Sequence, residues 1–418
     1  SGVTVASSWE DKYDQAFYSK IESEYENGYT TADTALEIGT AAQLAAFAEF
    51  VNSGKDFSGK FVCLTDDIDL QGVAPMADYQ NDGDDGFKVV LTGAVSNNWV
   101  PIGTESVDFE GTFDGKNHSI LGMTVKTDEC AGLFGRTSGA TIQNVGVKNS
   151  VVIAGNSAGK IVGYASSTDV TIQNCYATGE IYASYDGGFN SGAGGILGYS
   201  AWVTVKNCYN SGDVFAMSTS YEGICGGICG LFWYRNNMEN CFSTGRVYAY
   251  SPTGMDYCLV GGLVVVDPYH ASRIINSYYD KDVAGDIDAA PGDSSTENVE
   301  GLTTAEFKQK LVKLKDTNGN RMWFLEDLGF KLKTPRSSDF TFTLPEDLDY
   351  DGQGKTITIA PKPGITGMGA VTVKYYKVEN GSTTLLDGPP TDAGRYKVKF
   401  DVASGTEYYS AKDLPAMF

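Results

Sequence analysis

The fold is decided by a block that reads Ala193-Gly194-Gly195-Ile196-Leu197-Gly198, because versions of it recur along the chain. Related blocks begin at Cys130, Ala158, Cys225 and Val260, so successive starts differ by 28, 35, 32 and 35 residues. The last of them ends in Val265, where the others end in glycine. A repeat of about 32 residues is typical of a solenoid, a propeller or another array.

A second block follows each of the first and centres on asparagine, as in Ile172-Gln173-Asn174-Cys175-Tyr176. Three repeats close with a further glycine block, for example Gly179-Glu180-Ile181. Each unit therefore has three short strand-like runs separated by Gly or Asn turns, and no amphipathic helix. A propeller blade needs four strands. The repeat thus predicts a parallel β-helix with one unit per coil and about five coils.

Stacking of the coils explains two columns of residues. The asparagines can form an amide ladder at a turn, and Asn tolerates the left-handed backbone of such a corner; they are Asn144, Asn174, Asn207, Asn240 and Asn276. The chain has eight cysteines, of which Cys175, Cys208 and Cys241 share one inward position. We interpret them as small apolar core residues with free thiols. A stacked disulfide or a metal site is the alternative, although no Cys-x-x-Cys pair occurs.

The two ends of the stack need cover, because a β-helix exposes sheet edges there. Apolar residues at four-residue steps predict a helix from Trp9 to Tyr25, and Thr40 with Gln43 forms a capping-box pattern for a second one. A further helix is expected from Gly301 to Lys315. We assign 1–335 to this N-terminal helical cap and β-helix. From 339 to 418 alternating strands predict a small β-sandwich, an Ig-like module.

Composition excludes some functions. The formal net charge is −22, which is a poor match for a phosphate backbone, so nucleic acid is not an expected partner. No run of 18 apolar residues occurs, so membrane insertion is not expected either. The first residues lack a signal-peptide pattern, and we expect any such peptide to have been removed.

Three motifs in order resemble a bacterial family. They are Trp99-Val100-Pro101-Ile102-Gly103, the run from Phe109 to Ile120, and Gly132-Leu133-Phe134-Gly135, and together they resemble GLUG-motif cell-surface proteins over about residues 36–335. The tail, with Pro390-Thr391-Asp392-Ala393-Gly394, is similar to bacterial Ig-like modules of the MBG type. The resemblance implies a right-handed β-helix in a secreted or surface-attached protein, often beside adhesin modules and also flanking immunoglobulin A peptidases. It implies no catalytic residues.

Aromatic residues outside the core pattern are the candidate ligand-binding side chains. Aromatic faces stack on sugars and are favoured at interfaces. The candidates, which could alternatively cover a neighbouring loop, are Trp202, Tyr221, Phe232, Trp233 and Tyr234.

Acidic loops are the candidate calcium sites, because Ca²⁺ prefers carboxylate and carbonyl oxygens. One loop holds Asp82, Asp84 and Asp85, and a second holds Asp280 and Asp282. Solvated acidic loops are the alternative. The chain has only two histidines, His118 and His270, and no zinc-protease motif. The run from Gly155 to Gly159 has the spacing of a nucleophile elbow, but the sequence does not indicate the strand–turn–helix setting that such an elbow needs. We assign no catalytic residue.

These observations favour a non-enzymatic, adhesin-like scaffold that is extracellular, either secreted or attached to the cell surface. We expect it to be a monomer that binds a glycan or a host or microbial surface protein, with calcium as the one cofactor considered. Two alternatives stay open: a carbohydrate-active β-helix enzyme, either a polysaccharide lyase or a glycoside hydrolase, and a structural stalk.

Overall fold

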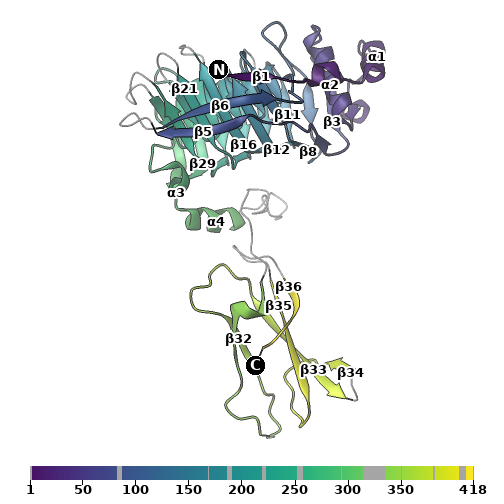
Figure 1. The fold of residues 1–418 in the computed structure, drawn as a ribbon, viewed down its shortest axis with the longest axis vertical. Coiled ribbons are helices and arrows are strands. Elements are labelled where there is room, and N and C mark those ends of the chain that lie inside the picture. The colour runs from purple at the N-terminus through teal and green to yellow at the C-terminus, as the bar shows by residue number, and fades with distance from the viewer. Residues whose placement is uncertain are drawn as a thin grey trace. The chain divides into compact units, whose positions relative to one another are not determined.

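The computed structural model describes the whole chain except residues 1, 82–86, 168, 186–190, 219–222, 252–257, 293, 314–334, 350, 380–381, 404–410 and 418. It divides into two compact units, Ser1–Phe307 and Lys308–Phe418. The sequence analysis placed this boundary between 335 and 339. The first unit is a solenoid of parallel strands and the second is a smaller antiparallel β unit (Figure 1).

The first face of the solenoid is a stack of parallel strands, one per coil. A single inward column runs along it from Leu36 through Val62, Phe113 and Ile142 to Ile274, with every neighbour in register and buried. The strands are β2 (Leu36–Ile38), β3 (Phe61–Leu64), β7 (Thr112–Asp114), β11 (Thr141–Gln143), β15 (Val170–Gln173), β19 (Val203–Lys206), β24 (Asn237–Glu239), β29 (Ser272–Asp280) and β30 (Ser294–Leu302). The stack therefore extends beyond the five predicted coils at both ends.

The other faces are built in the same way. The second face consists of β4 (Ile68–Asp69), β8 (Ser119–Leu121), β9 (Thr124–Thr127), β12 (Gly146–Ala154), β16 (Tyr176–Tyr185), β20 (Tyr209–Asn210), β21 (Val214–Ser218), β25 (Phe242–Ser243) and β26 (Val247–Tyr250). The glycine blocks form two further sheets. One has β10 (Phe134–Thr137), β14 (Val162–Ala165), β18 (Leu197–Ala201), β23 (Cys229–Tyr234) and β28 (Val264–Val266), and the other has β13 (Ala158–Gly159), β17 (Ala193–Gly194), β22 (Gly223–Gly226) and β27 (Cys258–Gly261).

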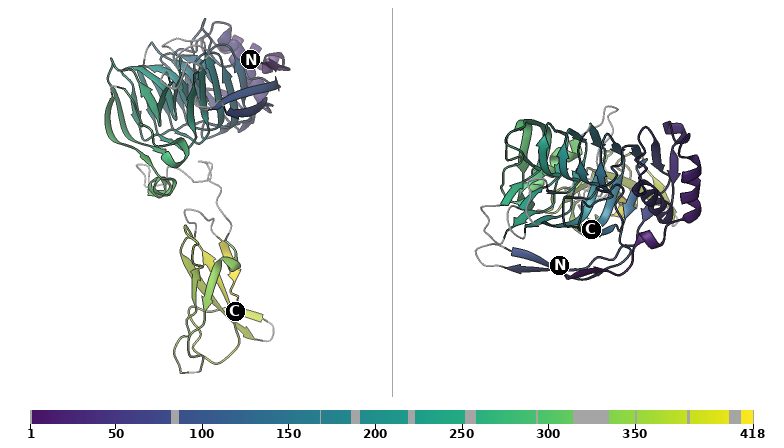
Figure 2. Two further views of the ribbon diagram at one scale, coloured as in Figure 1. Left: turned by 60° about the vertical axis from the view of Figure 1, so that its left-hand side comes forward. Right: turned by 90° about the horizontal axis from the view of Figure 1, so that it is seen from above.

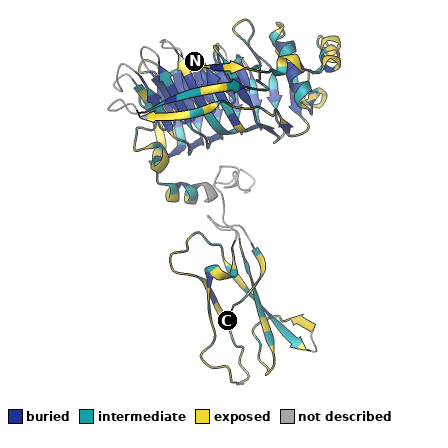
Figure 3. Cartoon of the chain, viewed as in Figure 1, coloured by how far each residue is buried: buried dark blue, intermediate teal, exposed yellow. Residues whose placement is uncertain are grey.

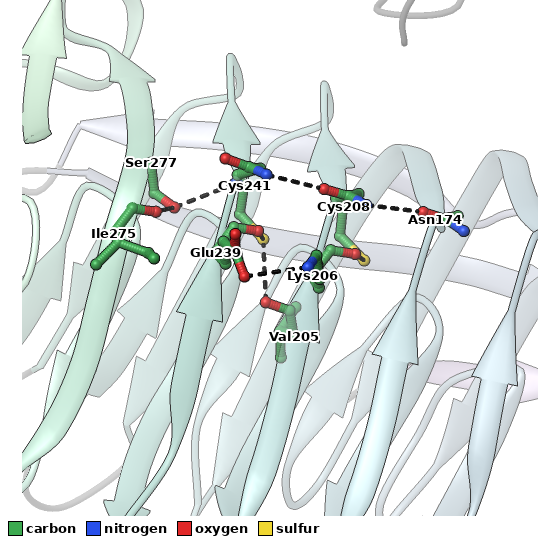
Figure 4. A network of polar contacts seen from close by, with 10 residues as sticks. Asn174, Val205, Lys206, Cys208, Glu239, Cys241, Ile275 and Ser277 are labelled. Carbon is green, nitrogen blue, oxygen red and sulfur yellow. Dashed lines mark hydrogen bonds and ion pairs between the residues drawn. The ribbon is translucent and has the colours of Figure 1, made fainter. Parts of the chain in front are cut away.

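Four of the five asparagines of the predicted ladder are joined by side-chain hydrogen bonds at the corner between the first and second faces, and within the described residues no such bond links the fifth, Asn276, to Asn240. Asn174 donates to Asn144 at 3.0 Å. Asn207 donates to Asn174 at 3.1 Å, and Asn240 donates to Asn207 at 3.1 Å; Figure 4 shows this part of the row, beginning at Asn174. All have positive φ, near +50°, as the predicted left-handed corner requires. A sixth asparagine, Asn298, donates to Asn276 at 3.0 Å in the last coil.

Asp114 closes the ladder at its first coil. Its carboxylate accepts from Nδ2 of Asn144 at 3.0 Å and from Nε2 of Gln143 at 3.1 Å. Burial alone would raise the pKa of Asp114, but hydrogen bonds from Asn144, the Lys116 backbone and Gln143 outweigh it and lower that pKa. A charged acceptor thus completes a row of neutral amides.

The cysteine column is also as predicted. Cys175, Cys208 and Cys241 are fully buried and unpaired, and each Sγ lies beside backbone carbonyls of its own and the preceding coil. Burial and the two neighbouring thiols raise the pKa of Cys208 well above its ordinary value. The interpretation as small core residues is confirmed. All eight cysteines are free, and Cys258 is the one that is only half-buried.

Helices close one end of the stack (Figures 1 and 2). Before them lie β1 (Val3–Val5) and the short helix η1 (Trp9–Asp11), followed by α1 (Gln15–Glu24), η2 (Ala32–Thr34) and α2 (Ala41–Asn52). Thr40 caps α2 by accepting from the Gln43 backbone, as its sequence pattern predicts. Phe47 of α2 contacts Phe109 and Phe113, so this helix buries the first coils.

A hairpin that the sequence analysis did not predict lies along the flank (Figure 1). It consists of β5 (Met76–Asn81) and β6 (Phe87–Val95), and β1 pairs with β6. Val89 and Val95 pack on outward residues of the second face, among them Tyr182 and Phe215. The outer layer therefore has its own apolar contact, and Figure 3 shows exposed residues along the strands of this hairpin.

The short helix α3 (Lys281–Ala284) lies between β29 and β30, and α4 (Thr304–Lys313) follows β30, inside the helix predicted from Gly301. The second unit contains η5 (Ser337–Asp339), a two-stranded sheet of β31 (Phe340–Thr343) and β32 (Thr358–Pro361), and an antiparallel sheet in the order β34 (Ser382–Leu385), β33 (Val371–Glu379), β35 (Tyr396–Val402) and β36 (Ala411–Pro415). Phe340, Ile359 and Phe400 form its core.

The prediction of a mainly β protein with long parallel sheets, consistent with a β-helix, and a small C-terminal β unit is confirmed. The right-handed sense and the Ig-like class stay predictions. None of the helices in the described residues is both long and apolar enough to cross a membrane.

Candidate functional site

Three of the predicted aromatic residues meet at one corner of the solenoid. Trp202 lies at the turn before β19, Tyr234 ends β23, and His270 precedes β29. The Trp202 and Tyr234 ring centroids are 4.5 Å apart, and those of Tyr234 and His270 are 4.3 Å apart. Trp233 adds a fourth ring, 6.3 Å from His270. We call Trp202, Trp233, Tyr234 and His270 the aromatic corner.

The corner exists because consecutive coils turn at the same place. Trp202 and Arg235 both have positive φ, +57° and +46°, and each lies between two strands of its coil. Coils are spaced by about 4.8 Å, the distance between neighbouring strands, which is also close to a ring-stacking distance. One aromatic per coil thus yields a continuous column.

Exposure differs among the predicted aromatics. Trp202 is 42% exposed, and Trp233 and Tyr234 are half-buried. The expectation of an exposed side chain is wrong for Phe232, which is fully buried, because the strand alternates and places this ring inward. Tyr221 lies outside the described residues. The accessible surface is therefore formed mainly by Trp202 and Tyr234, while Trp233 also packs against the cluster of Tyr199, Ile224, Leu231 and Val265.

A histidine–carboxylate pair anchors the corner. Nδ1 of His270 is hydrogen-bonded to Oδ2 of Asp267, and the Asp267 side chain is almost completely buried. This bond fixes the imidazole plane and leaves Nε2 on the other side of the ring. The sequence analysis named His270 but assigned it to no site, because a single histidine beyond a glycine block carries no spacing signal.

Positive charge gathers beside the corner although the chain is acidic. The Arg235 guanidinium lies 5.4 Å from the Tyr234 ring centroid. Next to the corner, on the outer side of the first face, is a depression of about 320 Å³. Thr204, Asn237, Glu239 and the exposed Arg273 line it, so hydroxyl, amide, carboxylate and guanidinium groups lie together there, and Glu239 pairs with Lys206 at 3.2 Å.

Of the two candidate calcium loops, one lies outside the described residues and the other is hydrogen-bonded within the fold. Asp82, Asp84 and Asp85 lie outside the described residues. Asp280 is buried and accepts from the Asp282 backbone at 3.0 Å and from the Thr304 hydroxyl at 2.7 Å, and burial raises its pKa. Asp282 accepts from the Thr304 backbone at 2.9 Å.

Asp280 and Asp282 thus brace the starts of α3 and α4. Within the part of the chain that the structure describes, no group of three or more His, Cys, Asp or Glu side chains is arranged to hold a metal ion. Calcium binding at these aspartates stays a prediction.

Other chemically suggestive residues have structural partners. Ser157, in the Gly155–Gly159 run, is fully buried inside a coil. Nδ1 of His118 lies 3.5 Å from the Asp67 carboxylate at a turn. Both residues are therefore explained by their place in a coil or at a turn.

The chain shows only a distant likeness to known proteins. No family model matches the chain, and no curated protein matches it. Among solved structures, a protein named "putative immunoglobulin A1 protease" from Bacteroides ovatus is 21% identical, with a TM-score of 0.44 over 70% of this chain and 93% of that one. A likeness at this level gives the chain neither a family nor an activity.

Proposed function

We propose that this chain is a secreted or cell-surface bacterial protein that acts as a rigid, non-enzymatic scaffold and binds a glycan through the aromatic corner. The supporting observation is the column of Trp202, Tyr234 and His270, one ring per coil. Sugar rings present C–H faces that stack on aromatic surfaces, and a column about three coils long spans more than one sugar unit. A protein ligand with apolar side chains is the second candidate for the same surface.

The charges beside the corner favour a glycan that carries carboxylate groups. Arg235 and Arg273 are exposed, and neither has an ion pair within the described residues. Guanidinium groups bind carboxylates with two parallel hydrogen bonds. An acidic sugar would therefore place its ring on Trp202 or Tyr234 and its carboxylate toward an arginine.

The runner-up, a carbohydrate-active enzyme, rests on the His270–Asp267 pair, in which a buried carboxylate orients an imidazole. Such a pair can serve as a base if a nucleophile or a bound water lies at the other nitrogen. In the described residues, His270 has no recorded hydrogen bond to a hydroxyl or a thiol. The non-enzymatic function is therefore the proposal.

A glycan array probed with the full chain, in calcium and in EDTA, tests the proposal. We expect binding to glycans that contain uronic or other acidic sugars. Trp202→Ala and Tyr234→Ala should each weaken binding roughly tenfold, about 1.4 kcal/mol. Tyr376→Ala, in the C-terminal unit, is the matched control and should leave binding unchanged.

Each other outcome points elsewhere. Equal binding by the corner variants and the wild type would remove the corner as the site. Loss of binding in EDTA would support calcium. Release of reducing sugar from a polysaccharide panel, abolished by His270→Asn, would replace the proposal with the enzyme. Absence of both binding and release would leave the structural stalk.

A further inference from the structure

Lys160 interrupts a column of glycines inside the solenoid. Ala158 and Gly159 pair with Ala193 and Gly194, so Lys160 is next in register with Gly195. The same position in the following coils is occupied by Gly227 and Gly262. The lysine side chain is fully buried. A cation is costly in such a place, so its partner is informative.

That partner is the carboxamide of Asn210, 50 residues further along the chain. Nζ of Lys160 lies 2.7 Å from Oδ1 of Asn210, which is also buried. Since a carbonyl bond is about 1.23 Å long, Nζ lies within about 4 Å of the amide carbon. No side chain separates them. A Cβ on Gly195 would meet Cγ of Asn210 at 2.2 Å, and one on Gly212 would meet Nζ at 2.5 Å.

The surroundings favour reaction between the two groups. Burial lowers the pKa of Lys160 to about 7, against the opposing effect of Asp213 and Glu180, so near neutral pH about half of the amine keeps its lone pair. The Gly212 N–H donates to Oδ1 of Asn210 at 3.1 Å, where negative charge develops when the carbonyl is attacked. The Ser243 hydroxyl lies 3.5 Å from Nδ2, the leaving nitrogen.

We propose that Lys160 and Asn210 become joined by an intramolecular amide bond. The Nζ lone pair attacks Cγ of Asn210, and the carbonyl π electrons move to Oδ1, which the Gly212 N–H stabilises. When the carbonyl re-forms, the bond between Cγ and Nδ2 breaks. Nδ2 takes one proton that Nζ gives up, and it leaves as ammonia. Nothing is oxidised or reduced, and no co-reactant is needed.

The mass of the folded full chain tests this bond directly. We expect an intact mass lower than that of the sequence by about 17 Da, the mass of one ammonia molecule. After unfolding and trypsin digestion, a branched peptide should contain both Lys160 and Asn210, and cleavage after Lys160 should be blocked. The wild-type chain suffices, so the result does not depend on whether a variant folds.

Matched variants exclude other losses of ammonia, because Asn-Gly sequences such as Asn27-Gly28 also lose it. Lys160→Met should restore the full mass, whereas Lys126→Met, at a lysine paired with Asp128 outside the core, should keep the deficit. A wild-type chain at full mass would overturn the proposal. So would a deficit that maps to a linear peptide cleaved normally after Lys160.

Discussion

The asparagine ladder allows a stability prediction that separates two physical effects. Asn207 has a φ of +52°, donates to Asn174 and accepts from Asn240, both at 3.1 Å. Asn149 has nearly the same φ, +51°, but no hydrogen bond of its side chain is recorded within the described residues. Replacing each with alanine therefore imposes the same backbone penalty but removes the ladder only at Asn207.

The magnitudes follow from these contacts. A left-handed backbone costs an alanine about 1–2 kcal/mol, and this is the whole expected loss for Asn149→Ala. Asn207→Ala also loses two amide hydrogen bonds, each worth about 0.5–1 kcal/mol at a corner that water can reach. We expect Asn207→Ala to lower the free energy of unfolding by about 2–4 kcal/mol, and by about 1–2 kcal/mol more than Asn149→Ala.

Urea unfolding followed by far-ultraviolet circular dichroism measures this difference, provided that refolding is reversible and the slope with denaturant is unchanged. Asn207→Gly is a useful third variant, because glycine accepts a positive φ but still removes the ladder. The reasoning would be refuted if Asn207→Ala and Asn149→Ala were equally destabilising. In that case the hydrogen bonds between the amides would stabilise the fold no more than hydrogen bonds from the same positions to water.

Three further predictions concern the interior and its ends. Asp114→Asn should destabilise the chain by about 1–3 kcal/mol at neutral pH. Because folding lowers the pKa of Asp114, the stability that its carboxylate contributes is present above about pH 4 and is lost as the pH falls through the lower folded pKa. The urea midpoints of the wild type and the variant should therefore converge in acid. Iodoacetamide should modify at most Cys258 in the native chain at pH 7.5 and all eight thiols after unfolding, because burial raises the pKa of Cys208 and raises that of Cys229 to about 12. Mass spectrometry counts the modified cysteines. Fast labelling of Cys208 in the native chain would contradict the prediction. Gly195→Ala should lower the free energy of unfolding by about 3 kcal/mol or more, because its Cβ would lie 2.2 Å from Cγ of Asn210. Gly388→Ala, which has open space around it, should lower it little. Equal melting temperatures of the two variants would contradict this prediction.

The sequence predicted what recurs in every coil. Positions such as Asn207 and Cys208 repeat at the same place, so their stacking follows from the period alone. The coils formed by β2, β3 and β7 were missed, because they continue the inward column without a glycine block. The flanking hairpin was missed for a related reason: Tyr182 and Phe215 point outward, and only a tertiary partner explains apolar residues there.

The candidate site was predictable only in part. Trp202, Trp233 and Tyr234 were recognised as aromatics outside the core pattern, and the stacking of coils brings them together. Phe232 was assigned to the surface because the sequence does not mark where strand alternation begins. The Lys160–Asn210 contact depends on an exact register over 50 residues, which no local pattern contains.

The asparagine ladder also has an electrical direction. Each amide from Asn144 to Asn240 donates toward the lower-numbered coil, so their dipoles align head to tail and the donor end meets the negative charge of Asp114. A carboxylate can accept but cannot donate, so no asparagine before it could continue the row. Duplication of a coil could therefore lengthen the row between Asn144 and Asn240, but an added asparagine could not extend it on the lower-numbered side of Asp114.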